Sequence, residues 1–493
     1  MNSNLVFAGD IPRQTISDRV RRGVLRPIAT GVYAADMETE PETIVARLWH
    51  VIVGHLLPNS VITDRSALTG GKVGGYLYLA HDRRAREIEL PGLTVSARPG
   101  AGPLSDDVAL PGGLFQASRP RGLAENTRPS RSRAGRPART LSDDEIAEWV
   151  DRLCRTDGVD RLTAYRIRAE EVASVVGAPP EGVARLARLV GAALGSQQVS
   201  SGSRALNARQ RGIPYDADRI VRLDALIATL RSSAPQSRPG LAPETAAYGV
   251  QAFYEAYFSN YIEGTTFTVD EARALVYEQI VPPGRHADGH DVVGTFSIIS
   301  DAASLGEVAA TAEEFLSLLM SRHAVLMGGR PDKHPGAFKL LPNQAGTTLF
   351  VDPGLVEGTL REGFVRLATL DTAWERAVYT SFLVADVHPF TDGNGRMSRV
   401  MMNAELVRGR QSKILVPTGF RNDYLTSLRR FSRFDDPSVY VKSMRFLHDY
   451  TQQIDWSTHE SASGDLQSTN AFEEENDSPR LTLLRPIEGR EIL

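Results

Sequence analysis

Apolar residues recur at about one helical turn along much of the chain. In the stretch 372–387 the regularly spaced apolar positions are Trp374, Val378, Phe382, Leu383 and Val387. This spacing predicts a helix with one buried side, and Pro389 ends it because proline cannot continue a helix. A second helical run follows Gly395, and its apolar positions are Val400, Met401, Ala404 and Leu406.

The same helical spacing of apolar residues predicts how the rest of the C-terminal two thirds is organised into domains. From Ile146 to about Leu230 the pattern is helical, with breaks at 177–180 and 200–203. We therefore predict a helical connector over 143–238 that ends in a Ser- and Pro-rich hinge, 232–243. A mainly helical domain is expected over 239–455. The polar stretch 456–493, with the acidic run 473–477, is predicted to lack fixed structure.

The N-terminal third alternates helix and strand signals. Residues 15–23 predict a short basic helix that exposes Arg19, Arg21 and Arg22, and residues 24–33 predict a Gly-turned strand pair. A helix followed by a hairpin is the outline of a winged helix-turn-helix, which we predict over 1–40. An α+β region is expected over 41–142. The N-terminal domain is either a DNA-contacting module or a structural, protein-binding one.

An arginine-rich segment lies within this α+β region. Residues 119–139 contain seven arginines, with only Glu125 to oppose them, and prolines at 120, 129 and 137. The segment is predicted to be a solvated, flexible loop. The alternative is contact with DNA phosphates, because mobile arginines gain affinity by releasing counterions.

Composition sets the broad class of protein. The chain has 493 residues, 42% of them hydrophobic and 24% charged, and a net charge of −4. These values predict several soluble globular domains without a global polycation. The single cysteine, Cys154, excludes a disulfide within the chain and suits a reducing compartment. We expect a cytoplasmic protein without a membrane-spanning segment.

Residues 388–399 carry the candidate chemistry. His388 can accept a proton near neutral pH, and the carboxylate of Asp392 can bind Mg²⁺ through hard oxygen ligands. Gly393, Asn394 and Gly395 allow a tight turn whose N–H groups face phosphate oxygens at a helix N-terminus.

Two arginines complete this segment. Arg396 and Arg399 are three residues apart, so they share one face of the following helix and can hold phosphates together. An ordinary helix–helix loop would need neither the histidine nor both arginines. The combination therefore predicts a site for phosphoryl transfer.

The segment resembles the signature of Fic-domain proteins, which most often use ATP to attach AMP to a hydroxyl side chain of a protein. The resemblance implies that His388 deprotonates the target hydroxyl and that Asp392 binds Mg²⁺. It further implies that Phe390 anchors the loop and that Arg399 contacts the γ-phosphate. The cradle for the α- and β-phosphates would be formed by Gly393, Asn394, Gly395 and Arg396. The implied fold is mainly α, an all-helical Fic fold with a β-hairpin flap, here preceded by an α+β region that contains the winged helix.

A second motif lies upstream. Residues 259–264 resemble the inhibitory helix motif of the same family, with Ser259, Glu263 and Gly264 at the matching positions. The resemblance implies that Glu263 forms the ion pair with Arg399 that the γ-phosphate otherwise needs. Without the neighbouring motif, the same residues would be interpreted as an ordinary helix C-terminus, because a helix that ends in Glu-Gly is common.

The stretch between the two motifs resembles the lead into the family's flap. The flap is expected at about 337–351, where its open edge would pair with the backbone of a target protein. The alternative is a surface hairpin without a partner. Residues 417–428, with Arg421, Asp423 and Tyr424, also resemble the family, which implies that they approach the nucleotide base. Capping and packing of a helix start explain the Asp-Tyr pair equally well.

Three functions remain open from the sequence. The first is a protein adenylyltransferase, autoinhibited in cis by Glu263. The second is a DNA-binding regulator with a nucleotide-sensing Fic domain, because parts of 1–142 resemble abortive-infection-type antitoxins. The third is a Fic enzyme that removes AMP. A homodimer is a further expectation.

Overall fold

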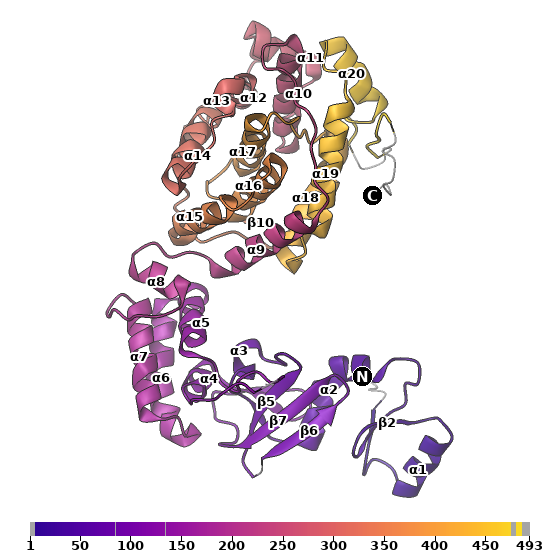
Figure 1. Ribbon diagram of the computed structural model, residues 1–493, viewed down its shortest axis with the longest axis vertical. Helices are drawn as coiled ribbons and strands as arrows, with labels where there is room; N and C mark the ends of the chain where they lie inside the picture. Colours follow the sequence, from indigo (N-terminus) through magenta and orange to yellow (C-terminus); the bar gives the residue numbers. More distant parts are fainter. Residues whose placement is uncertain (1–4, 84, 134, 475–479, 486–493) are drawn as a thin grey trace. The chain divides into compact units, whose positions relative to one another are not determined.

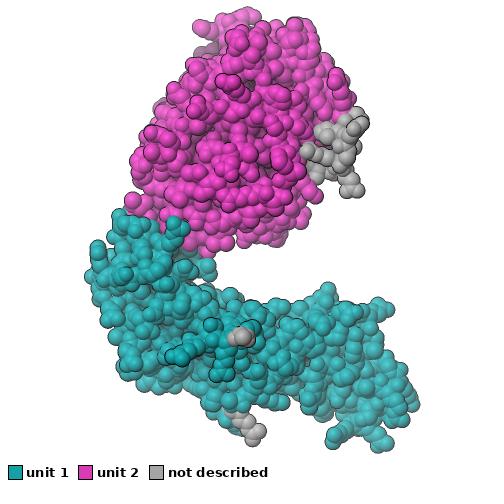
Figure 2. All heavy atoms as spheres, in the orientation of Figure 1, with its two compact units in different colours: residues 1–212 teal, residues 213–493 magenta. Residues whose placement is uncertain are grey.

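A computed structural model describes residues 5–83, 85–133, 135–474 and 480–485. The chain divides into two units, residues 1–212 and 213–493, which Figure 2 shows in different colours. Unit 1 combines two β-sheets with helices, whereas unit 2 is almost entirely helical (Figure 1). The predicted fold class, mainly α with an α+β N-terminal region, is confirmed.

Unit 1 begins with a small antiparallel sheet of order β1-β3-β2. Its elements are β1 (Leu5–Phe7), α1 (Arg13–Arg21), β2 (Arg26–Ala29) and β3 (Val32–Ala34). The predicted basic helix and strand pair are therefore present. A helix-turn-helix needs two helices, and the described residues 5–40 contain one, so the structure does not confirm the winged helix-turn-helix. Contact of this region with DNA stays a prediction.

A six-stranded mixed sheet of order β6-β7-β5-β4-β9-β8 follows. Two of its neighbouring pairs, β5 with β7 and β4 with β9, are parallel. Its strands are β4 (Val61–Ile62), β5 (Tyr76–His81), β6 (Arg86–Leu90), β7 (Leu93–Pro99), β8 (Val108–Leu110) and β9 (Leu114–Gln116), and its helices are α2 (Pro41–Leu56), α3 (Ser66–Thr69) and α4 (Arg119–Asn126). Ile52 and Val53 of α2 share a core with Leu77 and Val95 of the sheet.

The first part of the arginine-rich segment is a buried helix rather than a loop, which corrects the sequence-based prediction for residues 119–126. Residues 119–126 form α4, and Pro120 lies in its first turn, where proline is tolerated because the N–H there has no helical partner. Arg121 is fully buried, and its guanidinium contacts Asp107 at 2.6 Å and Glu125 at 3.3 Å. Burial raises the pKa of the Glu125 carboxyl, although the arginines around it oppose that rise.

Carboxylates from distant parts of unit 1 neutralise these arginines. Asp64 is buried and contacts Arg98 at 2.9 Å and Arg139 at 2.8 Å. Because Asp64 lies 75 positions before Arg139, no local pattern could show the pairing.

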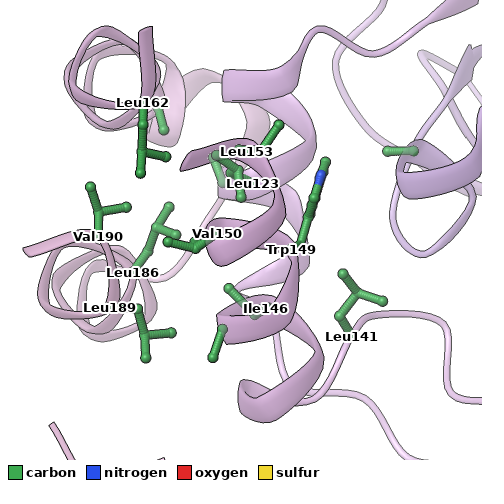
Figure 3. Packing of buried hydrophobic residues seen from close by; sticks show 14 of the residues in the cluster. Leu123, Leu141, Ile146, Trp149, Val150, Leu153, Leu162, Leu186, Leu189 and Val190 are labelled. Atoms are coloured by element: carbon green, nitrogen blue, oxygen red, sulfur yellow. The ribbon is translucent and has the colours of Figure 1, made fainter. Parts of the chain in front are cut away.

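The end of unit 1 is a helical layer. It consists of α5 (Asp143–Thr156), α6 (Val159–Val176), α7 (Pro180–Ala193) and α8 (Arg204–Gln210). Figure 3 shows Val150 and Leu153 of α5 lying close to Leu162 of α6 and to Leu186 of α7 in one buried cluster. The predicted helix breaks at 177–180 and 200–203 are confirmed.

In unit 2, helices α16 (Ala373–Val387) and α17 (Asn394–Arg408) lie at the centre of the bundle (Figure 1). All five apolar residues that predicted α16 are buried. The surrounding helices are α9 (Ala217–Ser232), α10 (Ala246–Ile262), α11 (Val269–Arg273), α12 (His286–Ser300), α13 (Ala302–Leu305), α14 (Ala312–Leu326), α15 (Val356–Leu367), α18 (Arg421–Phe434), α19 (Ser438–Gln453) and α20 (His459–Ser468). The flap is a hairpin of β10 (Gln344–Ala345) and β11 (Thr348–Leu349).

The two compact units divide at a different place from the predicted boundary between the connector and the C-terminal domain. Helix α9 belongs to unit 2, because the units divide between 212 and 213 rather than at 238. The proposed hinge at 232–243 is held within unit 2 instead. Arg238 donates to the buried Asp449 at 2.7 Å, and the N–H of Gly240 donates to the carbonyl of Arg410 at 3.0 Å.

The chain after residue 456 also differs from the prediction. It forms α20, whose Ala462 and Leu466 are fully buried. The ring of Phe472 packs against Phe258 of α10 at 5.3 Å between centroids. Few apolar residues suffice here because α10 offers a preformed aromatic surface. Residues 475–477 of the acidic run lie outside the described residues. Within the described part of the chain, no helix is long and apolar enough to cross a membrane.

The buried ion pairs of Arg121 generate a stability prediction. Arg121→Ala leaves the buried Asp107 without its cation and removes one of the two arginines that contact the buried Glu125, so we expect unit 1 to lose about 3–5 kcal/mol of unfolding free energy. Hydrogen–deuterium exchange of peptides from α4 to α7 measures this loss. The matched control is Arg131→Ala, an exposed arginine of the same segment, expected to change stability by less than about 0.5 kcal/mol. Equal effects of the two variants would contradict the role of the buried pairs.

Candidate active site

The loop that joins α16 to α17 forms the centre of the site. Thr372 caps α16 together with Glu375, and the helix ends at His388, whose φ is 53°. Gly393, with φ of 76°, precedes the first residue of α17. These two left-handed residues turn the chain sharply at both ends of the loop.

The side chains of Asn394 and His323 hold the loop in place. The side chain of Asn394 accepts from the N–H of Phe390 and donates to its carbonyl, both at 2.8 Å. The buried ring of Phe390 stacks on His323 of α14 at 3.7 Å. His323 also binds the carbonyl of Asp392 at 3.0 Å and the N–H of Gly336 at 2.9 Å. The loop is therefore positioned before any ligand binds.

His388 lies in a setting that suits a general base. Its ring stacks on Phe350 at 3.7 Å, and its Nδ1 lies 3.2 Å from the carbonyl of Ala385. A carbonyl only accepts, so Nδ1 carries the proton and Nε2 keeps its lone pair. Burial lowers the pKa of His388 to about 4. The imidazole is therefore neutral at pH 7 and able to accept a proton.

The N-terminus of α17 presents N–H groups that have no partner within the helix. Gly395 lies in this first turn, and a Cβ on it would stand 2.1 Å from Oε1 of Glu263. The Glu263 carboxylate is thus packed against the place where a helix N-terminus attracts an anion.

Arg399 connects α17 to the end of α10. It is buried, and its guanidinium donates to the hydroxyl of Ser259 at 2.9 Å, to the Ser259 carbonyl at 2.8 Å and to Glu263 at 2.7 Å. Gly264, with φ of 93°, lets the chain leave the helix directly after Glu263. The expected contact between Glu263 and Arg399 is present.

Arg396 also lies inside the site. It forms an ion pair with Asp291 at 3.0 Å and donates to Asn260 at 3.3 Å. Its Nε is buried and makes no hydrogen bond to the residues that the structure describes, which leaves a donor for an anionic ligand.

Asp392 is exposed at the mouth of the loop, and one of its carboxylate oxygens accepts from the N–H of Gly393 at 2.6 Å. The structure describes no cluster of three or more His, Cys, Asp or Glu side chains that could hold a metal ion. A single carboxylate still fits Mg²⁺, because this ion commonly takes one or two carboxylates together with substrate phosphates and water.

The flap borders the site. The backbone N–H of Lys339 donates to the carbonyl of Pro389 at 2.9 Å, and the Asn343 side chain donates to the Phe390 carbonyl at 3.0 Å. Burial lowers the pKa of Lys339 to about 8. The expected hairpin at 337–351 is present, and its two paired strands are only two residues each.

The structure brings all the residues singled out in the two motifs into one place. The side chain of Asn394 shapes the loop, and the contact of its backbone N–H with a phosphate stays a prediction. Three positioning residues were not predicted from the sequence. His323 positions the loop, Asp291 positions Arg396, and Phe350 positions His388. No local pattern marks them, because each acts across a distance in sequence. Tyr424, expected near the nucleotide base, is buried.

The N-terminus of α17 thus brings together unpaired helix N–H groups, the His388 ring and the guanidinium groups of Arg396 and Arg399. Residues 315–406 match the model of the Fic/DOC family, and this part of the chain is a Fic domain.

Curated relatives share this region. The chain is 26% identical over 251 residues to "Protein adenylyltransferase Fic" of Nematostella vectensis. The aligned region covers 47% of this chain and 56% of that protein. It is 25% identical over 182 residues to "Protein adenylyltransferase fic-1" of Caenorhabditis elegans, and this aligned region covers 36% of each chain. The matches thus span about a third to a little over half of these relatives.

Solved structures are similar at a lower level. "Fic-1 (aa134 - 508) from C. elegans" has 18% identity and a TM-score of 0.36, covering 67% of this chain and 90% of that chain. The structure "IbpAFic2 covalently tethered to Cdc42" has 13% identity and a TM-score of 0.31, covering 61% of this chain and 86% of that chain.

The protonation state of His388 can be measured directly. We expect an NMR titration of the histidine Cε1–H signals, assigned with His388→Ala, to place its pKa about two units below the ordinary 6.5, near 4. Burial is the cause, because it disfavours the charged imidazolium. A signal that titrates near 6.5 would show that the ring is solvated and would remove this argument for a neutral base.

Proposed function

We propose that the chain is a protein adenylyltransferase, which transfers AMP from ATP to a Ser, Thr or Tyr hydroxyl of a protein. One observation carries the proposal: His388, whose Nδ1 faces the carbonyl of Ala385 so that Nε2 is free to accept a proton, ends the helix whose loop leads into α17, which carries Arg396 and Arg399. The names of the curated relatives support the same activity.

In the proposed reaction, Nε2 of His388 accepts the proton of the target hydroxyl. The hydroxyl oxygen attacks the α-phosphorus of ATP, and the bond from that phosphorus to the oxygen bridging the α- and β-phosphates breaks. The products are a phosphodiester between AMP and the target, and pyrophosphate. Mg²⁺, held by Asp392, would neutralise phosphate charge. The chain's own contribution is positioning and charge stabilisation.

Glu263 acts as an inhibitor in this proposal. Its carboxylate pairs with Arg399 and lies against Gly395, so it occupies the arginine that would contact the γ-phosphate and the turn that would hold the α- and β-phosphates. ATP bound beside Glu263 would have its γ-phosphate displaced and its α-phosphate out of line with the attacking hydroxyl.

Loss of the base should stop the chemistry without loss of the nucleotide. For His388→Ala we expect AMP transfer to fall by roughly 10²–10⁴-fold, while ATP binding measured by calorimetry stays within about twofold, because the phosphate-facing groups remain. His286→Ala, an exposed histidine of α12, is the matched control and should transfer normally. Wild-type transfer by His388→Ala would refute the mechanism.

Removal of the competing carboxylate should activate the enzyme. We expect Glu263→Gly to raise protein labelling by ATP radiolabelled at the α-phosphate at least about tenfold, since displacement of reacting groups costs orders of magnitude in rate. Glu263→Asp should activate only in part, because the shorter side chain reaches less far.

Two further variants complete this test. Arg399→Ala in the Glu263→Gly background should abolish transfer, because the phosphate contact is lost. Glu278→Ala, an exposed carboxylate beyond the motif, should leave labelling unchanged. The inhibitory role is refuted if Glu263→Gly and Glu278→Ala label alike while labelling still depends on His388.

A further inference from the structure

An arginine of α9 reaches the candidate active site. The side chain of Arg219 is 11% exposed, and its guanidinium donates to the carboxylate of Asp386 in α16 at 2.6 Å and to the carbonyl of Leu349 in the flap at 2.5 Å. Helix α9 lies beside the flap in Figure 1. It precedes residues 315–406, which match the family model. A residue from outside that match thus joins α16 to the flap.

The two groups that Arg219 joins lie on either side of the candidate base. Asp386 is in the last turn of α16, two residues before His388. Leu349 directly precedes Phe350, whose ring stacks on the His388 ring at 3.7 Å between centroids. The helix that ends at the base and the ring that covers the base are therefore connected to the same guanidinium.

The peptide group between Leu349 and Phe350 is held from both sides. Its N–H, which belongs to Phe350, donates to the carbonyl of Asn343 across the hairpin at 3.2 Å. The N–H and the carbonyl of a trans peptide point in opposite directions, so the Leu349 carbonyl faces away from Asn343 and towards Arg219. The paired strands of the hairpin are only two residues each, and so short a hairpin is not stable alone. The bond from Arg219 therefore contributes to the position of Phe350.

The buried carboxylate of Asp386 has further partners besides Arg219. Arg222 lies 3.0 Å from it, and the hydroxyl of Ser432 donates to it at 2.8 Å. Removal of the Arg219 guanidinium thus leaves this buried charge paired, and we expect the fold of unit 2 to persist. The effect of such a variant is concentrated on the flap.

We propose that Arg219 is a positioning residue of the candidate active site, which keeps Phe350 stacked on His388 by holding the peptide group that precedes Phe350. The stacked ring restricts the orientations of the imidazole and so keeps Nε2 directed towards one place, where a hydroxyl can be deprotonated. The inference rests on the proposed function, because the orientation of the ring matters for the reaction only if His388 is the base.

The pKa of His388 reports whether Phe350 covers it. Burial is the main cause that lowers this pKa, and the charged groups that also act on the ring are Lys339, Glu263 and Asp392. If Phe350 leaves, water reaches the imidazole and favours its charged form, so the pKa rises. Loss of a nearby positive charge also raises the pKa of a histidine. The experiment must therefore separate the contact made by Arg219 from its charge.

The first test compares two arginines that share one carboxylate. Arg219→Met removes the bond to the flap, and by NMR titration of the full chain we expect the pKa of His388 to rise by at least about one pH unit. Arg222→Met is the matched control, because Arg222 pairs with Asp386 and with Asp435. It should change the pKa of His388 by less than about 0.3 pH unit. Equal changes in the two variants would overturn the proposal.

A second substitution separates contact from charge. Phe350→Ala should by itself raise the pKa of His388 by at least about one pH unit, because the covering ring is gone. Adding Arg219→Met to Phe350→Ala should then change the pKa by less than about 0.3 pH unit, since the residue through which Arg219 acts is missing. A full further rise in the double variant would assign the effect to charge, and an unchanged pKa in Phe350→Ala would remove the role of the ring. Either result would overturn the proposal.

Transfer activity separates this inference from the proposed function. In the Glu263→Gly background, Arg219→Met should lower kcat for labelling at least about tenfold, because the base is no longer held in place, and should change KM for ATP by less than about twofold. Labelling that does not depend on His388 would refute the transferase and leave the NMR result for Arg219 standing. Labelling that depends on His388 but is unaffected by Arg219→Met would keep the transferase and overturn the positioning role.

Discussion

The arrangement of unit 2 around its site depends on one buried cation. Arg399 is fixed by the hydroxyl and carbonyl of Ser259 and by the carboxylate of Glu263, and a buried guanidinium without anionic partners would be strongly destabilising. It therefore ties α10 to α17 while no nucleotide is bound. In the proposed function a phosphate of ATP would bring equivalent charge to the same place, so a substrate would replace the contact that Glu263 makes with Arg399.

The loop between α16 and α17 shows how the fold prepares this competition. His323, Asn394 and the first limb of the flap fix the loop through neutral hydrogen bonds and ring stacking, which need no ligand. The charged groups, by contrast, depend on partners that can be exchanged. Different residues therefore hold the loop rigid and pair with the anions that can be exchanged. A substitution can alter the pairing with anions without altering the rigidity of the loop.

Unit 1 uses buried charge in the opposite way. Arg121, Arg98 and Arg139 are held by Asp64, Asp107 and Glu125 from within the unit, so these arginines are committed to the fold. Counting charges along the sequence suggested a solvated, DNA-facing loop. The structure shows that Arg121 in particular is not solvated, because its side chain is fully buried and paired with carboxylates.

The sequence by itself determined the features that arise within one or two helical turns. It fixed the limits of α16, the turn before α17, the shared face of Arg396 and Arg399, and the helix end at Glu263, because these depend on local periodicity, proline and glycine. Only the tertiary structure decided which distant groups meet. It placed α9 in unit 2, ordered α20 against α10, buried Arg121 of the arginine-rich segment, and brought His323, Asp291 and Phe350 to the site. Burial and ion pairing depend on neighbours in space, and those neighbours lie tens to hundreds of positions apart in the chain.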